Sequence, residues 1–218
     1  MTRETPGGNR AGTRRGRPVD AGKQRAIFDA ARRMFTEHGI AGTGMDELAD
    51  AAGVSKGTIY NHFGGKRALF EAILHDLLRQ LPAPDEVIGR FDDALAQPLP
   101  ARLLAVAGAV RTLATSPLIH DIQRMLALPA GAADGRKPSF WRACVVPYRL
   151  EFARLLEQET RAGRLRVDDA RAAASQFFSM VASEPFIRML MGEASDRRER
   201  AGESLEATVA AFLRAWRP

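Results

Sequence analysis

Side chains suited to contacting DNA gather in one short stretch, residues 43–66. A helix expected over its second half presents a largely polar outer face, made of Lys56, Gly57, Tyr60 and Asn61, with Thr58 and His62 at its edge. An asparagine can pair with N6 and N7 of adenine, and a lysine is attracted to phosphates. A glycine allows the backbone to come close to a partner. This combination predicts contacts in a DNA major groove.

Two short helices joined by a tight turn are expected to position these side chains. Thr43 is predicted to N-cap the first helix, with Asp46 three residues later as an acidic variant of the capping box. Gly53 ends that helix, because a residue without Cβ adopts the left-handed conformation easily, and Ser55 caps the second helix. Apolar residues at helical spacing face inward, namely Met45, Leu48, Ala49, Ala52, Val54, Ile59 and Phe63. The stretch is therefore predicted to be a helix-turn-helix.

The motif GVSKGTIYNHFGGKRALF closely resembles the DNA-binding signature of the TetR/AcrR family of bacterial transcriptional regulators, and the resemblance covers about residues 20–80. It implies phosphate contacts for Thr43, Tyr60, His62 and Lys66. It implies base contacts for Lys56, Gly57, Thr58 and Asn61, and Ser55 belongs to the same DNA-binding set. It also implies a homodimer on a palindromic operator in double-stranded DNA, and a second domain whose small-molecule effector releases the protein. SPLIHDIQRML and FFSMVASEPFIRMLMG are similar to the AefR-like branch.

The basic residues are unevenly placed along the chain. Residues 1–70 hold 12 lysines and arginines against 7 aspartates and glutamates, whereas residues 71–218 hold 20 against 19. A polyanionic partner for the first part is the simplest explanation. Arg14, Arg15 and Arg17 lie in a Gly/Pro-rich arm and resemble the core of minor-groove AT-hooks. The alternative is a solvated tail that attracts DNA without sequence preference.

Helical periodicity continues to the end of the chain, and no stretch alternates as a strand does. We predict an all-α fold with an N-terminal three-helix helix-turn-helix domain and a larger helical ligand-binding and dimerisation domain. The predicted division is a disordered basic arm over 1–19, a DNA-binding domain over 20–80 and an effector-binding and dimerisation domain over 81–218. The helices expected outside the motif span about 20–38, 66–79, 85–95, 103–113, 117–126, 140–162 and 196–216, and another begins near 168.

Pro147 and Pro185 fall inside two predicted helices of the second domain, where each removes a backbone hydrogen bond and favours a kink. Kinks between packed helices open space, so the residues around them are candidates for a mostly apolar effector pocket. These are Phe140, Trp141, Cys144, Tyr148, Phe177, Met180 and Phe186, with His120 as a possible polar anchor. Ordinary core packing explains the same residues equally well.

The last two helices are predicted to form half of a four-helix dimer interface, because one recognition helix reads only a few base pairs and a two-fold dimer on a palindrome is expected. The candidate interface residues are Leu205, Val209, Phe212, Trp216, Ala173 and Phe177. The alternative is that both apolar stripes face the core of their own protomer.

Catalytic and metal-binding patterns such as HExxH, CxxC and GxxxxGK do not occur in the sequence, and its one GxSxG string, GVSKG over residues 53–57, joins two predicted helices where a nucleophile elbow would follow a strand. We therefore expect no metal or cofactor, and a regulator rather than an enzyme. Cys144 is the single cysteine, the first residues lack the apolar segment of a secretory signal, and no run approaches a membrane span, so a cytoplasmic protein is expected. Two alternatives stay open: a helical domain that binds a protein partner, and an enzyme fused to a DNA-binding domain.

Overall fold

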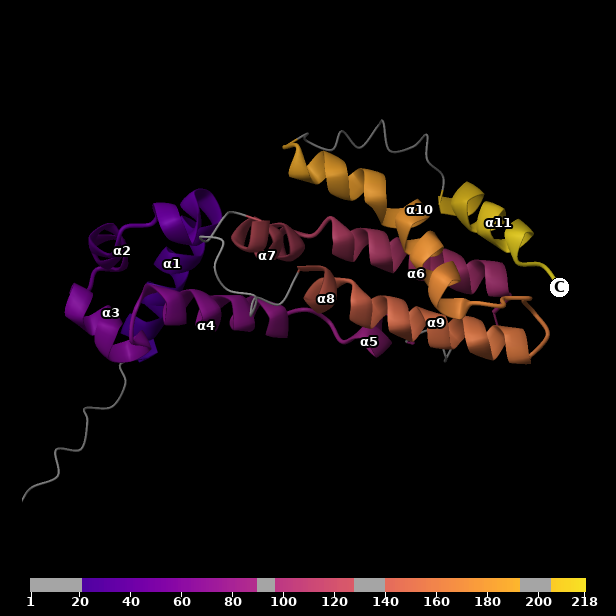
Figure 1. Ribbon diagram of the computed structural model, residues 1–218, viewed down its shortest axis with the longest axis horizontal. Coiled ribbons are helices and arrows are strands. Elements are labelled where there is room, and N and C mark those ends of the chain that lie inside the picture. Colours follow the sequence, from indigo (N-terminus) through magenta and orange to yellow (C-terminus); the bar gives the residue numbers. More distant parts are fainter. Residues whose placement is uncertain (1–20, 90–96, 128–139, 193–204) are drawn as a thin grey trace, which may run out of the picture.

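The computed structural model describes residues 21–89, 97–127, 140–192 and 205–218, and within them the chain is all-α, as predicted. Figure 1 shows an elongated molecule with α1, α2 and α3 at one end and α6, α9, α10 and α11 at the other. The helices are α1 (Ala21–Gly42), α2 (Met45–Ala52), α3 (Lys56–Phe63), α4 (Lys66–Arg79), α5 (Pro84–Ile88), α6 (Leu99–Ala114), α7 (Pro117–Ala127), α8 (Phe140–Cys144), α9 (Val146–Arg161), α10 (Ala170–Leu190) and α11 (Leu205–Ala215).

The buried apolar residues form two clusters, which we call the head core and the body core. The head core joins α1 to α4 with α7 and Cys144, and the largest side chains fully buried in it are Ile27, Phe35, Leu48, Ile59, Leu69, Ile73 and Leu77. The body core joins α5, α6, α9, α10 and α11 around the rings of Phe152 and Phe177, which stack, and of Phe212, which meets Phe177 edge-on. Helix α7 follows α6 in the chain, yet it packs on α1 and α4 and so belongs to the head core.

The turn between α2 and α3 has the geometry that the sequence predicts. Gly53 adopts the left-handed conformation at φ 64° and ψ 34°, which a residue with a Cβ reaches only with strain. Its amide donates to the carbonyl of Asp50, and the amide of Val54 donates to the carbonyl of Ala49. These bonds satisfy the last carbonyls of α2 and direct the chain into α3.

The helix expected from Phe140 to Ala162 is wrong as one continuous element. It divides at Val145 into α8 and α9, and Pro147 lies in the first turn of α9. A proline is tolerated there because the first amides of a helix have no partner within it, so the chain breaks instead of kinking. Pro185, in contrast, lies inside α10 as predicted, and the Asp169 carboxylate caps that helix by accepting from the amides of two residues that follow it.

Several expected features lie outside the described residues. They are the basic arm with Arg14, Arg15 and Arg17, the part of the expected 85–95 helix beyond Gly89, the side chain of Phe140, and the start of the last helix near Asp196. Within the described residues the last helix begins at Leu205.

A buried ion pair fixes α6 to α9. Arg102 and Glu159 are 4% and 1% exposed, and their side chains lie 2.8 Å apart. Arg164, just beyond α9, also donates to the Glu159 carboxylate. The hydrogen bonds from Arg164 and Arg102 hold the pKa of Glu159 below its usual value, although burial acts in the opposite direction. Removing either partner of this buried pair would leave the other charge without compensation and would strongly destabilise the fold.

Two polar contacts add to this packing, the first within the head and the second between the head and the body. The Arg32 guanidinium on α1 donates to the Asp121 carboxylate on α7, at 2.6 Å and 3.1 Å. The Tyr148 hydroxyl on α9 donates at 2.6 Å to the carbonyl of Pro82, which follows α4.

None of the described helices is by itself long and apolar enough to cross a membrane. Helices α6 and α7 reach that length and composition only as a pair, and they are bent by 50° at their junction.

Candidate nucleic-acid interface and ligand pocket

Helix α3 is held on the head core by its inner face and capped at its start. Ile59 is fully buried, and the ring of Phe63 packs against that of Phe28 on α1 at 5.4 Å. The Ser55 hydroxyl accepts from the amide of Thr58 at 3.1 Å, which is the predicted N-cap. The hydroxyls of the same two residues also lie 2.8 Å apart. Both hydroxyls are therefore engaged at the start of the helix in the protein alone.

The outer face of α3 is open to solvent. Gly57, Tyr60 and Asn61 are exposed, and Tyr60 keeps 46% of its surface accessible. A Cβ built on Gly57 would meet only the Ser55 Oγ, at 3.8 Å. No contact within the described structure therefore requires a glycine at this position. His62 is half-buried beside Phe63.

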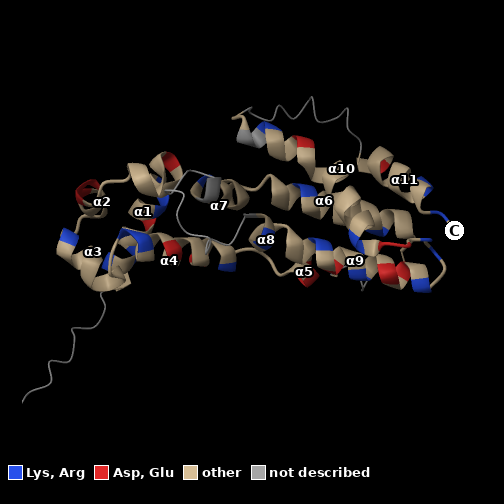
Figure 2. Ribbon diagram, in the orientation of Figure 1, with Lys and Arg blue, Asp and Glu red and all other residues tan. Residues whose placement is uncertain are grey.

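Lys56 is paired within the protein. Its Nζ lies 2.9 Å from the Asp46 carboxylate of α2, with both side chains largely exposed. The hydrogen bond to Asp46 raises the pKa of Lys56. Figure 2 shows charges of both signs on α2 and α3, so the described head is not a uniformly basic surface. Two further N–H groups of the Lys56 ammonium remain for a phosphate beside the Asp46 carboxylate.

The structure corrects the expected cap of α2. Its N-cap residue is Gly44 and no side chain caps it, so the capping box of Thr43 and Asp46 is wrong. Thr43 is 1% exposed, and its hydroxyl donates inward to the carbonyl of Gly39 at 2.8 Å. Gly39 has a positive φ of 69° that interrupts α1, and the hydroxyl satisfies a carbonyl at that break. A phosphate contact through the Thr43 hydroxyl is therefore not available in this conformation.

Lys66, like Lys56, donates a hydrogen bond to another part of the protein. Its Nζ donates at 2.9 Å to the backbone carbonyl of Thr43 and is half-buried. The ammonium thus ties the start of α4 to the start of α2. Two further N–H groups of the ammonium remain for a phosphate.

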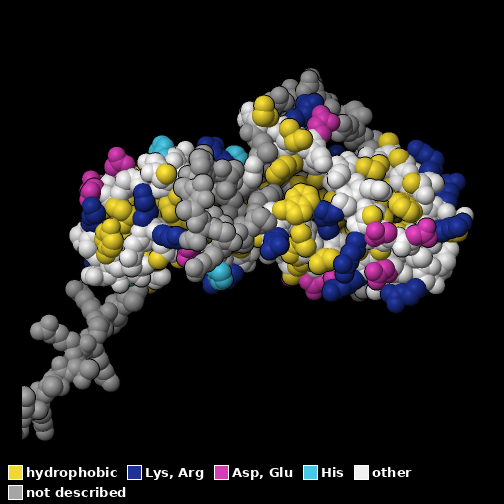
Figure 3. All heavy atoms as spheres, in the orientation of Figure 1, with side chains coloured by type: hydrophobic (Ala, Val, Ile, Leu, Met, Phe, Trp, Pro, Cys, Tyr) yellow, Lys and Arg dark blue, Asp and Glu magenta, His cyan; other side chains and the backbone are white. Residues whose placement is uncertain are grey.

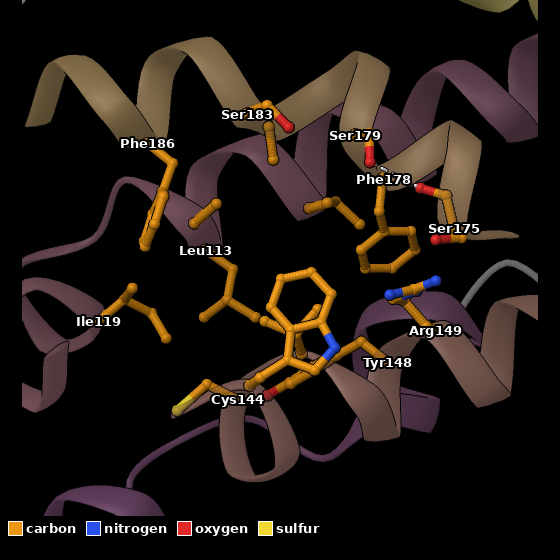
Figure 4. Close-up of a pocket in the computed structure, with 15 residues that line it drawn as sticks. Leu113, Ile119, Cys144, Tyr148, Arg149, Ser175, Phe178, Ser179, Ser183 and Phe186 are labelled. Atoms are coloured by element: carbon orange, nitrogen blue, oxygen red, sulfur yellow. Dashed lines mark hydrogen bonds between the residues drawn. The ribbon is translucent and has the colours of Figure 1, made fainter. Parts of the chain in front are cut away.

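A cavity opens between α6, α8, α9 and α10, with α7 at one end (Figure 4). Its volume is about 790 Å³, including the part open to solvent. Its lining is mostly apolar and consists of Val110, Leu113, Ala114, Ile119, Trp141, Cys144, Val145, Tyr148, Arg149, Ser175, Phe178, Ser179, Ala182, Ser183 and Phe186. Figure 3 shows hydrophobic side chains gathered between α8 and α10 on the corresponding face.

The cavity brings together four of the predicted pocket residues, namely Trp141, Cys144, Tyr148 and Phe186. Three other predicted residues, Phe177, Met180 and His120, do not line the cavity. Phe177 is fully buried in the body core and Phe178 lines the cavity instead, while Met180 points outward with 48% of its surface exposed. On α7 it is Ile119 and not His120 that reaches the wall. One residue along a helix turns the side chain by about 100°, which is enough to exchange core for cavity.

Sequence reasoning missed Arg149 and the serines of α10. Ser175, Ser179 and Ser183 recur every four residues and so share one side of the helix. That spacing was visible in the sequence. Arg149 comes directly after Tyr148, which the sequence analysis had already placed in the pocket, so its neighbour was a reasonable candidate for the same wall.

Burial explains the state of the two titratable groups on the cavity floor. It raises the pKa of the Cys144 thiol to about 12 and that of the Tyr148 hydroxyl to about 12. Both groups are neutral at ordinary pH. The thiol of Cys144 is therefore a poor nucleophile, and the neutral Tyr148 hydroxyl donates its proton to the carbonyl of Pro82. The described residues hold no group of three His, Cys, Asp or Glu side chains able to bind a metal ion.

Comparison with known proteins identifies both parts of the chain. Residues 27–73 match the model of the bacterial regulatory proteins of the tetR family, and residues 101–218 match the C-terminal domain of AefR-like transcriptional repressors. The chain belongs to the TetR family. It is 30% identical to the uncharacterized helix-turn-helix-type transcriptional regulator YdeS of Bacillus subtilis over 155 residues, which cover 71% of this chain and 73% of YdeS.

Solved TetR-family structures share the whole fold. A regulator from Mesorhizobium loti superposes with a TM-score of 0.64 at 27% identity, over 93% of this chain and 100% of that one. The flavonoid-responsive regulator FrrA superposes with a TM-score of 0.60 at 29% identity, over 91% and 98%. In contrast, the chain spans only 45% of the length of two mycobacterial relatives that it matches at 33% identity. Helices α2 and α3 lie within residues 27–73, the part of the chain that matches the tetR-family model.

The residues predicted for a TetR-family dimer interface mostly fill the core of their own protomer. Val209, Phe212, Ala173 and Phe177 are at most 3% exposed, and Leu205 and Trp216 pack against the same body core. The reason is the ring cluster with Phe152, which closes α11 on α9 and α10. The four buried side chains are therefore not available to a second copy in this conformation, whereas Leu205 and Trp216 are half-buried.

Proposed function

We propose that the chain is a homodimeric, sequence-specific DNA-binding regulator, a repressor that a small and mostly apolar ligand releases from a palindromic operator. The observation that carries the proposal is the open outer face of α3 at one end of a molecule whose other half encloses a cavity. The matches to TetR-family regulators and to an AefR-like repressor domain support it.

On DNA, the outer face of α3 enters the major groove. Asn61 pairs with adenine, Gly57 allows the backbone to approach the base edges, and Tyr60 holds a phosphate. Thr58 and Ser55 contribute after the contact between their hydroxyls rearranges, and Lys56 contributes through the N–H groups that Asp46 does not use. His62 and Lys66 reach the phosphates on either side. The basic arm, with Arg14, Arg15 and Arg17, follows the neighbouring minor groove or attracts DNA without sequence preference.

The dimer forms through the outward face of α10. Met180 and Ile187 on this helix, and Met191 directly after it, are large apolar residues with 48%, 55% and 75% of their surface exposed. Their spacing of seven and four residues places them in one line along the helix, as in a helix-packing seam. This seam replaces the buried residues first assigned to the interface. Two copies joined along it present two recognition helices to one palindrome.

The ligand acts on the DNA-binding end through the elements that touch both the cavity and the head. Ile119 and Cys144 line the cavity and also belong to the head core. Tyr148 lines the cavity and holds the backbone at Pro82, just after α4. A ligand that shifts these residues moves α7 and the end of α4, and it shifts the equilibrium only if it binds the two states with different affinity. Helices α4 and α7 are therefore the two elements that carry the signal.

Melting curves followed by DNA release test this function. A ligand at 100 times its dissociation constant stabilises the folded protein by about 2.7 kcal/mol, so compounds from a library that raise the melting temperature are selected first. Each selected compound is then added to the protein on an operator recovered from random DNA, and the fluorescence anisotropy of the DNA is followed. Release at the concentration that stabilises the protein is expected. If compounds stabilise the protein but do not release DNA, the proposal that a ligand releases the regulator from its operator is refuted. If no compound in the library binds, a protein partner for the helical half is favoured.

A further inference from the structure

The cavity has two chemically different ends. Figure 4 shows Ile119 and Phe186 at one end, with Arg149, Ser175 and Ser179 at the other. The first end adjoins the head core through Ile119. A ligand that fills the cavity therefore meets apolar surface towards the head and polar groups at the opposite side.

Arg149 is a cation without a carboxylate partner among the described residues. Its guanidinium carbon lies 5.3 Å from the centre of the Trp141 ring, a cation–π contact that positions the group and leaves its N–H donors unused. Arg154, five residues later on the same helix, shows the usual alternative, since it donates to Glu151 at 2.6 Å. Arg149 is half-buried, so an anion beside it keeps part of its hydration and avoids the cost of complete burial.

Hydroxyl groups extend the polar end along α10. Figure 4 shows the Arg149 nitrogens and Ser175 on the same side of the cavity. The Ser179 hydroxyl donates to the carbonyl of Ser175 at 3.0 Å, whereas the Ser175 and Ser183 hydroxyls have no partner among the described residues. A guanidinium with adjacent hydroxyl donors is a recurrent arrangement for binding anionic oxygens.

The middle of the cavity is lined by rings. Trp141, Tyr148 and Phe178 line it, and Phe186 adds a fourth ring at the apolar end. Aromatic walls favour flat aromatic ligands because ring pairs add stacking and edge contacts to simple apolar burial. The Tyr148 hydroxyl is already engaged with Pro82, so this residue offers the ligand its ring face and not its donor.

We propose that the cavity binds an amphipathic aromatic anion: a planar ring body that carries one carboxylate or sulfonate group. The anionic oxygens lie at Arg149 and Ser175, the rings pack against Trp141, Tyr148 and Phe178, and the apolar end reaches Ile119. The assignment rests on the proposed ligand-binding function and gives it a chemical class.

Two fluorescent probes that differ in one group test the proposal on the full chain without DNA. Anilinonaphthalene sulfonate is an aromatic anion, and N-phenylnaphthylamine has the same ring body without the sulfonate. Both become bright when they leave water, so their dissociation constants come from the same titration. The variant is Arg149→Gln, and the matched control is Arg154→Gln, which removes the same charge from the same helix outside the cavity. Melting curves verify that both variants fold as the wild type does.

Arg149→Gln is expected to raise the dissociation constant of the sulfonate probe by about tenfold or more, which is the effect of losing a hydrogen bond to a charged group. The dissociation constant of the neutral probe should change by no more than about twofold. Arg154→Gln should leave both probes unchanged. Equal weakening of both probes by Arg149→Gln, or no weakening of the sulfonate probe, overturns the anion assignment. If neither probe binds the wild-type protein, the cavity is not a site for aromatic ligands and the ligand half of the proposed function fails with it, whereas DNA binding is untouched by this outcome.

Discussion

The substitution Gly57→Ala adds one methyl group and should have different effects on the stability of the fold and on DNA binding. Gly57 lies in the first turn of α3 with helical geometry, and an added methyl group would meet only the Ser55 Oγ at 3.8 Å, an ordinary van der Waals distance. Alanine is favoured over glycine in a helix by up to about 1 kcal/mol. The variant should therefore melt about 2–4 °C higher than the wild-type protein.

The same methyl group lies between the backbone of α3 and the base edges on DNA. Loss of one good base contact costs about 1–3 kcal/mol for each half-site, and each 1.4 kcal/mol corresponds to a tenfold change in affinity. The variant should thus bind its operator at least about tenfold more weakly, measured by fluorescence anisotropy at one fixed salt concentration. Stability and DNA affinity are expected to change in opposite directions.

Gly108→Ala on α6 is the matched control. Gly108 is also helical, and a Cβ at this position would meet no atom within 4 Å. This variant should gain stability in the same way and bind DNA as the wild-type protein does. If Gly57→Ala melts higher and still binds DNA with full affinity, the close approach of α3 to the groove is refuted.

Four further predictions test other parts of the molecule. Asn61→Ala should relax base preference at one position in each half-site, whereas Tyr60→Phe should lower the affinity for all DNA sequences alike. If the base preference of Asn61→Ala is unchanged, Asn61 does not contact a base. Ile187→Glu should give folded monomers by sedimentation, and Leu150→Glu, an exposed leucine on α9, should not; a dimeric Ile187→Glu rejects the α10 seam. Glu159→Gln should lower the free energy of unfolding by about 3–5 kcal/mol at pH 7. Because the folded pKa of Glu159 is depressed, this difference should persist above pH 4.5, its ordinary pKa, and shrink as pH falls through the folded pKa; a difference independent of pH would contradict the charge pair. Tyr148→Phe removes the hydrogen bond to Pro82 and should preserve ligand affinity while reducing the release of DNA, measured by anisotropy; full release would exclude this contact from the coupling.

Local sequence signals predicted the helix-turn-helix because each of them acts within a few residues. Gly53 and Ser55 set the turn and the cap by their own backbone and hydroxyl chemistry, and the structure confirms both. Thr43 failed for the opposite reason. Its hydroxyl found a carbonyl exposed by the break at Gly39, a feature of tertiary packing that a capping pattern does not contain.

The cavity and the dimer seam were harder to predict because α10 and α11 carry apolar residues on more than one side. Phe177 and Phe178 are identical in type and adjacent, and only the packed structure shows that the first fills the core and the second lines the cavity. Phe212 looked equally suited to a partner or to its own core. The choice depended on Phe152, 60 residues away in the chain, whose ring closes the cluster.

Selection from a pool of random double-stranded DNA tests the central claim most directly. The wild-type chain and the Asn61→Ala variant are each used to recover bound sequences over several rounds, and the enriched sequences are aligned. The wild-type chain should enrich an inverted repeat with the two halves related by a dyad, and Asn61→Ala should lose preference at one symmetric pair of positions. Enrichment without dyad symmetry, or the same sequences for both proteins, would contradict a dimer that reads DNA through α3.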